Sequence, residues 1–282
     1  TVLPHLMRTN EMPTRHPLLE ISEIDTHIEV YLKQIGEITY RFPEHDSKCQ
    51  SLRVLVGNEH WFVKHGNTPQ TIRWLKQAVR FHAAVQHEAL PQLHNAFATP
   101  DCFALVYNWV DGEGLRPERE LRPDEIHPRD RFCALPAVEI IDALNVIYDV
   151  HILIEKQGFI AEDFYDGCII YHFEKKQIHL FDFDFYHPGP FINDRGRLYG
   201  STRFMAPEEF QKGTYIDART NVFMLGRTAF VLLANNSDSR DDWKGNDALW
   251  HVAKKATNAD KQLRYPSVQA FVSAWHAAIN DF

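Results

Sequence analysis

Two segments of the chain carry acidic residues of the kind that enzymes use for proton transfer and cation binding. Residues 158–170 read GFIAEDFYDGCII, with Asp163, Asp166 and Cys168 close together, and residues 179–185 read HLFDFDF. Aspartate oxygens accept protons or bind Mg²⁺, whereas a neutral thiol is a poor ligand for this hard ion. The question is whether this acidic loop does chemistry or is the remnant of a site.

The elements that would position these residues begin with a β-rich region. IEVYLKQI (28–35), SLRVLVG (51–57) and HWFVKHG (60–66) predict short strands, the last two joined by a tight turn. Residues 68–90 have helical spacing with two apolar stripes, which predicts a helix packed on more than one side. A further hairpin is predicted up to residue 110.

The composition changes after residue 110, and we divide the chain there. Residues 111–136 are rich in charge and proline, which predicts a linker with surface excursions. Helical spacing then begins at residue 137 and ends at Gly158, and a hairpin and further helices follow. We predict an α+β protein with a β-rich small lobe at 26–110 and an α-rich large lobe at 111–282.

The overall composition is that of an ordinary folded protein. The 282 residues are 44% hydrophobic, and the net charge of -8 argues against a nucleic-acid partner or an anionic membrane surface. The four cysteines form no CxxC pair, so neither a disulfide framework nor a zinc knuckle is indicated, and a cytoplasmic setting is expected. The sixteen histidines show no metal-binding spacing and are interpreted as surface and packing residues.

No segment predicts a membrane span or a secretory signal. The apolar run at 221–236 is interrupted by Gly226, Arg227 and Asn235 and falls short of the roughly 20 residues that a span needs. It is interpreted as a buried core helix. Residues 1–25 contain three prolines and no apolar core, which predicts an extended N-terminal arm.

Six segments, in order along the chain, resemble the motifs of eukaryotic-type protein kinases. The first four resemble the phosphate-binding lysine, the catalytic loop, the metal-binding segment and the APE segment: FVKHG (62–66), IAEDFYDGCII (160–170), HLFDFDF (179–185) and YGSTRFMAPEEF (199–210). DARTNVFMLG (217–226) and LRYPSVQAFVSAW (263–275) resemble two later motifs, and in the family the arginine of the last, here Arg264, pairs with the APE glutamate, here Glu208. The resemblance covers residues 30–278 and implies a two-lobed protein kinase-like fold with one αC-type helix in the small lobe.

This resemblance implies that ATP and Mg²⁺ bind between the lobes. Phosphoryl transfer needs a cation near the phosphates, Mg²⁺ to spread charge, and a carboxylate that orients the attacking hydroxyl. By alignment with the family, Lys64 is the phosphate-binding cation, Asp182 is the Mg²⁺ ligand and Asp163 is the base.

The resemblance also assigns an adenine site. Phe62 replaces a small alanine of the family, on the same strand face as Lys64 because side chains alternate. Its ring is either a plug in the adenine pocket or a platform, since related aminoglycoside phosphotransferases stack an aromatic ring on adenine at this position. Asn108 to Val110 correspond to the hinge whose backbone binds adenine, with Tyr107 as the gatekeeper.

Several positions in the acidic segments depart from the family pattern. Glu162 replaces the arginine that, in the family, holds a phosphorylated activation segment, which corresponds here to the residues between Asp182 and Glu208. Control by phosphorylation of that segment is therefore not expected. Tyr165 replaces a substrate-binding lysine, and Cys168 replaces the asparagine that binds a second metal ion. Asp184 replaces a glycine, and either supplies an oxygen near the second metal ion or is a solvated turn residue. Asp166 is interpreted as loop structure.

The small lobe departs from the pattern as well. Only Gly36 lies near the position of the family's glycine-rich loop. Gln77 and Ala78 stand where the family's helix carries the glutamate partner of the lysine, so Lys64 is expected to lack a carboxylate partner.

These observations predict a divergent serine/threonine kinase-like phosphotransferase that uses ATP and acts on a protein hydroxyl. The APE-like segment favours a protein as acceptor and partner. Phe62, Asp184 and Tyr165 favour the alternative of a small-molecule phosphotransferase. The missing glycine loop, helix glutamate and second-metal asparagine favour a pseudokinase that acts as a binding or scaffolding module.

Overall fold

A five-stranded antiparallel sheet occupies the first part of the chain in the computed structural model, which describes residues 16–43, 47–117 and 120–279. Its strands are β1 (Glu37–Arg41), β2 (Gln50–Val56), β3 (Glu59–Gly66), β4 (Leu93–Ala98) and β5 (Phe103–Asn108). They lie in the order β1-β2-β3-β5-β4. The predicted strand pairs β2–β3 and β4–β5 are therefore confirmed, and the central strand β3 carries Lys64 opposite Leu105 of β5.

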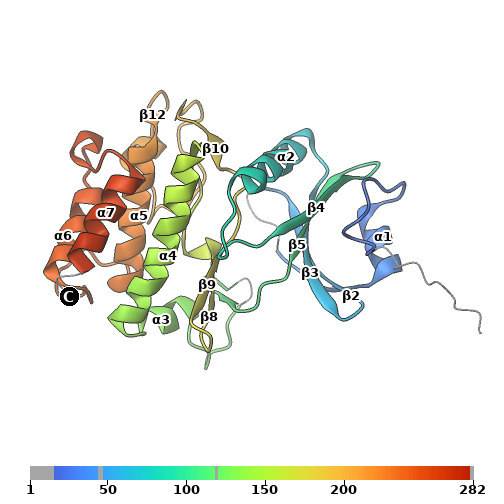
Figure 1. Cartoon of the computed structure of the whole chain (residues 1–282), viewed down its shortest axis with the longest axis horizontal. Coiled ribbons are helices and arrows are strands. Elements are labelled where there is room, and N and C mark those ends of the chain that lie inside the picture. The colour runs from blue at the N-terminus through green and yellow to red at the C-terminus, as the bar shows by residue number, and fades with distance from the viewer. Residues whose placement is uncertain (1–15, 44–46, 118–119, 280–282) are drawn as a thin grey trace, which may run out of the picture.

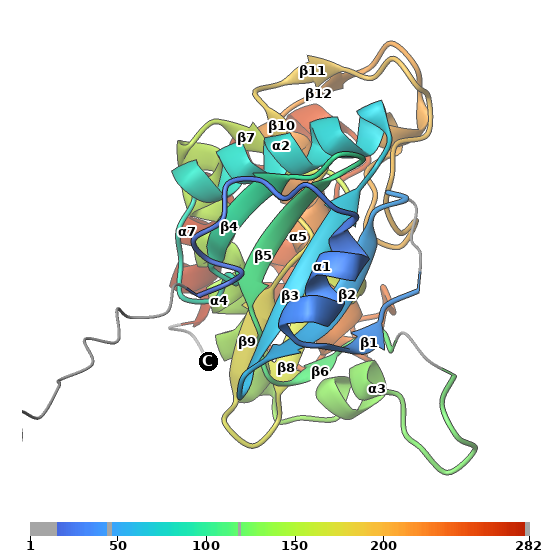
Figure 2. The same cartoon turned by 90° about the vertical axis from the view of Figure 1, so that its right-hand side faces the viewer.

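A short helix, α1 (Ile28–Ile35), covers one face of this sheet (Figure 2). The strand predicted for these residues is wrong. Ile28 and Leu32, four residues apart, are fully buried, whereas Val30 between them is 48% exposed. A strand would have placed all three side chains on one face, so the burial of every fourth residue favours the helix. Ile28 and Leu32 pack there with Trp61 and Val63 of β3.

A longer helix, α2 (Pro69–Ala84), packs against the opposite face of the sheet. It begins where the Thr68 hydroxyl accepts a hydrogen bond from the Thr71 amide at 3.1 Å, an N-terminal cap. Its buried Leu75 and Ala78 contact Leu105 and Tyr107 of β5 in one apolar cluster. Trp61 and Val63 of β3 face α1, and side chains alternate along a strand, so Phe62 and Lys64 lie on the face covered by α2.

Five further α-helices lie in the described chain after residue 127. They are α3 (Pro128–Cys133), α4 (Ala137–Lys156), α5 (Ala218–Leu233), α6 (Asp247–Ala256) and α7 (Val268–Ile279). Figure 1 shows α4 to α7 side by side on the side of the molecule away from α1. The long helix predicted from residue 137 is confirmed, whereas the predicted linker 111–136 also contains α3 and the two-residue strand β6 (Glu113–Gly114). Phe132 of α3 is fully buried, so this part of the linker belongs to the core.

Short strands form three smaller antiparallel sheets. β8 (Ile169–His172) pairs with β9 (Gln177–Leu180), which confirms the hairpin predicted after Gly158, and β6 adds a third strand by pairing with β8. The other two sheets join β7 (Phe159–Ile160) to β10 (His187–Pro188), and β11 (Phe191–Ile192) to β12 (Tyr215–Ile216). The mixture of helices and antiparallel sheets agrees with the predicted α+β class.

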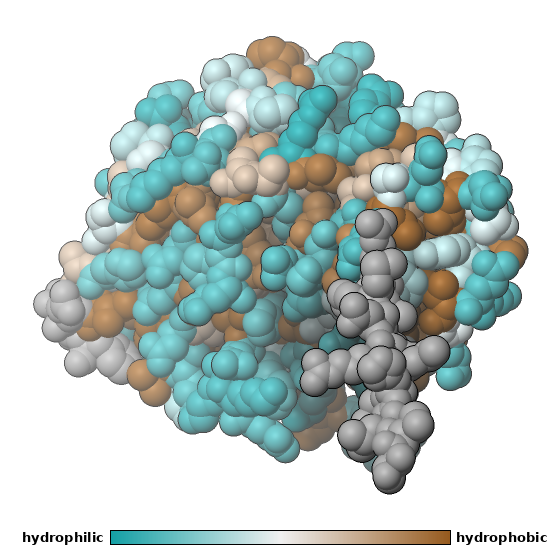
Figure 3. All heavy atoms as spheres, turned by 45° about the vertical axis from the view of Figure 1, so that its right-hand side comes forward, coloured by the Kyte–Doolittle hydropathy of each residue, from teal (hydrophilic) through white to brown (hydrophobic). Residues whose placement is uncertain are grey.

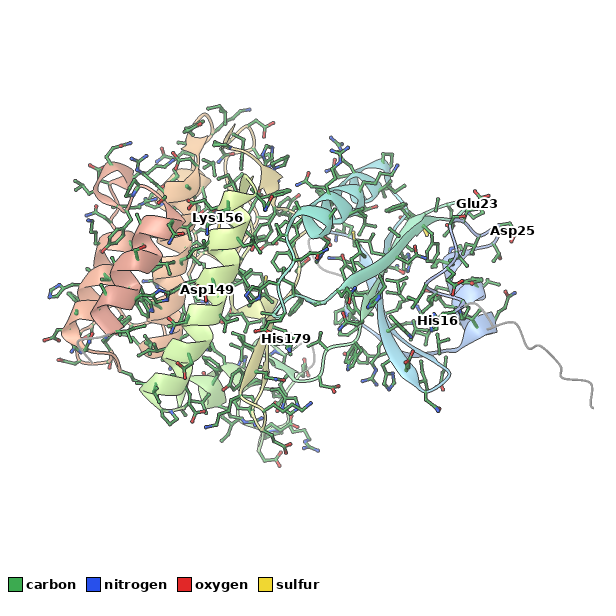
Figure 4. The ribbon with its side chains drawn as sticks, viewed as in Figure 1. His16, Glu23, Asp25, Asp149, Lys156 and His179 are labelled. Atoms are coloured by element: carbon green, nitrogen blue, oxygen red, sulfur yellow. The ribbon has the colours of Figure 1, made fainter. Side chains whose placement is uncertain are left out.

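The predicted N-terminal arm, residues 1–25, falls within the described residues only from residue 16 onward. That part packs on the sheet. Leu18 is fully buried, the Tyr31 hydroxyl donates a hydrogen bond to the Pro17 carbonyl at 2.6 Å, and Glu23 forms a β-bridge with Ala98. Figure 4 shows His16, Glu23 and Asp25 at the end of the molecule opposite Asp149 and Lys156 of α4.

The face of the molecule shown in Figure 3 is mainly hydrophilic, and the cysteines are buried. Hydrophilic residues dominate the face shown in Figure 3, with smaller hydrophobic areas between them. All four cysteines are buried and unpaired, so no disulfide links the chain. None of the described helices has the length and apolarity needed to cross a bilayer.

Candidate functional site

A cavity of about 930 Å³ opens between the face of the sheet that carries Phe62 and Lys64 and the loops around β8 and β9. Pockets for small ligands and cofactors are typically about 300–1,000 Å³, so this one has the size of a ligand site. Lys64, Asp182 and Asp184 form a charged group in its lining, and Phe42, Phe62 and Trp109 contribute aromatic surface.

Two carboxylates hold Lys64 in this cavity. The Nζ atom lies 2.8 Å from Asp182 Oδ1 and also forms an ion pair with Asp184 Oδ2. The expectation that Lys64 lacks a carboxylate partner is therefore wrong. Helix α2 supplies none, as predicted, but the segment after β9 supplies two, which sequence spacing did not reveal.

Helix α2 positions the segment that carries both aspartates. Phe183, between them, stacks on Phe81 with ring centroids 4.6 Å apart and 13° between the planes. The Gln77 side-chain amide donates a hydrogen bond to the Tyr186 carbonyl. Asp182 itself has a φ of 69°, in the left-handed region, which is uncommon for non-glycine residues but which aspartate adopts more readily than most. The packing of α2 thus fixes the backbone from which both carboxylates project.

The electrostatics of the three charges are those of a buried cluster. Burial lowers the pKa of Lys64, but the charges of Asp182 and Asp184 outweigh burial and raise this pKa well above its usual value. Burial raises the pKa of Asp184, and Lys64 opposes that shift. The Asp184 side chain is only 3% exposed and that of Asp182 is 27% exposed. Asp182 is thus the carboxylate open to a ligand, whereas Asp184 faces the lysine.

Aromatic rings line the cavity on the side of β3. Phe62 contacts Phe42 with centroids 5.5 Å apart and Tyr107 with centroids 6.1 Å apart. Phe62 is half-buried and lines the cavity, so a flat apolar surface faces the space beside Lys64. Such a surface can stack on a planar ligand ring.

The two backbone positions predicted to bind adenine differ in their hydrogen bonds. The Asn108 amide donates to the Gln92 carbonyl at 3.3 Å, and its side-chain oxygen accepts from the Gln92 amide at 2.6 Å. Val110 lines the cavity, and its amide has no hydrogen bond to another backbone group among the described residues. Val110 rather than Asn108 therefore offers a backbone donor to a ligand.

Asp163 lies in a loop next to this cavity rather than in its lining. Its φ is 67°, and its carbonyl accepts a hydrogen bond from the Cys168 thiol at 3.3 Å. Burial, followed by the charges of Asp182 and Asp163, raises the pKa of Cys168 well above its usual value. Both carboxylates thus lie close enough to one buried thiol to raise its pKa. This thiol stays protonated, so it is a poor Mg²⁺ ligand.

The segments around Asp163 are tied down by ion pairs that the sequence pattern revealed only in part. Arg264 binds Glu208 through two hydrogen bonds of 2.7 and 3.0 Å, which confirms the pairing implied by the motifs. Asp166 is 2% exposed, and its two oxygens accept from Arg203 at 2.7 and 2.8 Å. The latter partner was not predicted. The buried aspartate in the catalytic-loop motif and the arginine in GSTRFMAPEE were the available signals.

Metal binding by the protein alone has little support. Across the described ranges, no group of three or more histidine, cysteine, aspartate or glutamate residues is placed to hold a metal ion. Mg²⁺ is commonly held by only one or two carboxylates together with the phosphates of a nucleotide, so Asp182 still fits that role. Comparison with known proteins finds no matching family model and no matching curated sequence.

Proposed function

We propose that this chain is a divergent protein kinase-like phosphotransferase that binds ATP with Mg²⁺ in the 930 Å³ cavity and phosphorylates a hydroxyl of a protein. The observation that carries the proposal is the convergence of Lys64, Asp182 and Asp184 in one cavity beside an aromatic surface. A cation for the phosphates, a solvent-accessible carboxylate for Mg²⁺ and a stacking surface for the base are what a site for a nucleoside triphosphate requires. The ordered sequence motifs support the same assignment.

In this proposal each group has a separate task. The Phe62 ring contacts the adenine, and the Val110 amide donates to it. Lys64 and Asp182 face the phosphates, and Asp182 would hold Mg²⁺ together with the phosphates, whose negative charge the bound ion would spread. Asp163 orients the acceptor hydroxyl and accepts its proton.

In this proposal Asp184 does not bind a second metal ion. Because Asp184 is buried against Lys64, it is a positioning residue for the lysine. It thereby replaces the carboxylate that α2 does not supply. A lysine held by a fixed partner presents its charge in one place, which favours preorganised phosphate binding.

A binding or scaffolding module without catalysis is the second candidate function. Its supporting observation is that two carboxylates already neutralise Lys64. A ligand phosphate must compete with these carboxylates for the cation. This candidate predicts weak or absent nucleotide binding, so a binding measurement separates the two.

Thermal unfolding with ATP, in the presence of Mg²⁺ or of a chelator, tests the proposal. A ligand at 100 times its Kd stabilises the folded state by about 2.7 kcal/mol, which corresponds to a rise in Tm of roughly 5 °C or more. We expect this rise with Mg²⁺ and a smaller one with chelator. In Asp182→Ala the two conditions should give the same Tm, whereas the exposed control Asp238→Ala should behave as the parent. A parent protein with no ATP-dependent rise would favour the binding module.

A further inference from the structure

A buried carboxylate lies directly before Asp163. The Glu162 side chain is 5% exposed, and its Oε1 atom accepts hydrogen bonds from Arg195 Nη2 at 2.5 Å and from the Tyr199 amide at 3.3 Å. A carboxylate removed from water costs free energy unless it is paired and hydrogen-bonded. Both compensating donors come from the same stretch, residues 193–200.

That stretch is preorganised to deliver its arginine. Asn193 is fully buried, and its side-chain oxygen accepts from the amides of Arg195 and Gly196 at 3.1 and 3.0 Å. The Arg195 guanidinium then lies over the Tyr199 ring, 4.9 Å from its centroid. Arg195 thus forms the ion pair from a turn whose backbone is already fixed.

The far end of the stretch touches Asp163. Gly200 has a φ of 134°, and a Cβ atom added to it would lie 3.7 Å from the Asp163 Cα atom and 3.2 Å from Met205 Cγ. The neighbouring Tyr199 ring stacks on Phe185 with centroids 4.6 Å apart. Residues 199–200 are therefore packed against both the loop of Asp163 and the segment of Asp182 and Asp184.

We infer that Arg195 is a positioning residue, and that its ion pair with Glu162 holds residues 193–200 against the loop of Asp163 so that this carboxylate meets the acceptor hydroxyl in a fixed orientation. The role of Asp163 in this inference rests on the proposed function. The chain itself supplies both charges of this anchor, the Arg195 cation and the Glu162 anion. The anchoring therefore needs no added phosphate group. We call this arrangement the Glu162–Arg195 clamp.

Charge exchange in the full chain tests the clamp without reference to activity. Arg195→Glu and Glu162→Arg each place like charges together, and the double variant restores opposite charges. Loss of a hydrogen bond to a charged group should speed amide hydrogen exchange of residues 195–200 by about tenfold or more in each single variant, with recovery in the double variant. Because an arginine at the buried position 162 can prevent folding, Glu162→Gln and Arg195→Gln are measured in parallel.

The ion pair between Arg240 and Asp247, the first residue of α6, provides a control in which the arginine has nearly the same exposure. Arg240 is 41% exposed, against 40% for Arg195. Arg240→Glu should leave both the hydrogen exchange of residues 195–200 and the reaction rate as in the parent. Exchange in Arg195→Gln and Arg195→Glu that is equal to the parent would overturn the clamp.

The reaction arm uses ATP with Mg²⁺ as the probe, with water or a hydroxyl of the chain itself as the phosphoryl acceptor, and ADP release as the readout. Small displacements of a catalytic group cost about 10²-fold in rate, so Arg195→Gln should lower kcat by about that factor. The KM for ATP should change by less than about twofold, because the nucleotide contacts lie on other residues. An unchanged kcat, or a loss that follows global unfolding in circular dichroism, would contradict the positioning role.

Failure of the clamp and failure of the proposed function give different results. A parent protein that releases no ADP and shows no ATP-dependent rise in Tm contradicts the proposed function. Hydrogen exchange then decides the clamp alone, since faster exchange in the single variants with recovery in the double supports it and unchanged exchange overturns it.

Discussion

Lys64 on β3 and Asp184, on the loop after β9, form a buried ion pair in the lining of the main cavity. This pair joins the five-stranded sheet to a loop far along the chain, and Asp182 adds a second carboxylate 2.8 Å from the same nitrogen. The lysine is therefore oriented from the loop and not from the neighbouring helix α2. Proper assembly of the cavity thus depends on contact between these two distant parts.

Asp184→Asn should destabilise the fold because it removes one charge of a buried pair. Breaking a buried pair costs about 3–5 kcal/mol, and the lower end is expected here because Lys64 keeps Asp182 as a partner. Urea unfolding measures the change. Asp238→Asn, which breaks an ion pair of Arg227 with a 63% exposed aspartate, is the control and should cost less than about 1 kcal/mol. Equal losses in the two variants would refute a special role for Asp184.

Asp163→Asn should separate catalysis from binding. A general base contributes about 10²- to 10⁴-fold to the rate, so phosphoryl transfer should fall within that range. The rise in Tm with ATP and Mg²⁺ should stay close to that of the parent, because Asp163 does not line the main cavity. Equal rates of ADP release in the variant and the parent would contradict the assignment of the base.

Arg264→Ala should be among the most destabilising single changes. The Arg264 side chain has no solvent exposure, and it binds both oxygens of Glu208. Removing it takes the cationic partner from a carboxylate that is only 10% exposed, and breaking a buried pair in this way costs about 3–5 kcal/mol. In a double-mutant cycle with Glu208→Gln, the double variant should lose much less than the sum of the single losses. Additive losses would show that the two side chains do not depend on each other.

Glu209 should make stability depend on pH. Burial raises the pKa of Glu209 to about 8, against a usual value of 4.5, although the Ala206 amide opposes this shift. The folded chain then binds a proton more tightly than the unfolded chain. This contribution to stability is present below the unfolded pKa and is lost as pH rises from 4.5 to about 8.

Glu209→Gln, which stays neutral, should remove that loss. Between pH 5 and pH 8 the parent should lose up to about 4 kcal/mol of unfolding free energy through this group, and the variant should not. Urea unfolding at both pH values measures the difference, with the exposed Glu174→Gln as control. A variant whose pH dependence equals that of the parent would contradict the shift.

Local patterns in the sequence determined several elements and one long-range pair. The helical spacing of residues 68–90 and 137–158 predicted α2 and α4, because burial of one helix face repeats every three to four residues. The motif match alone predicts the pair of Arg264 and Glu208, which the structure contains. The same reasoning failed for Ile28–Ile35, since eight residues with apolar side chains at several spacings fit a strand as well as a helix.

Tertiary structure alone decided which charges meet. The partner of Lys64 depends on how the loop after β9 packs on α2, and the partners of Glu162 and Asp166 depend on where residues 193–203 return to the loop of Asp163. None of these pairs has a fixed spacing in the sequence. Ion pairs between distant loops are set by packing of the whole chain, whereas helix periodicity is a property of neighbouring residues. The sequence by itself therefore determined the candidate groups, and the folded chain decided their partners.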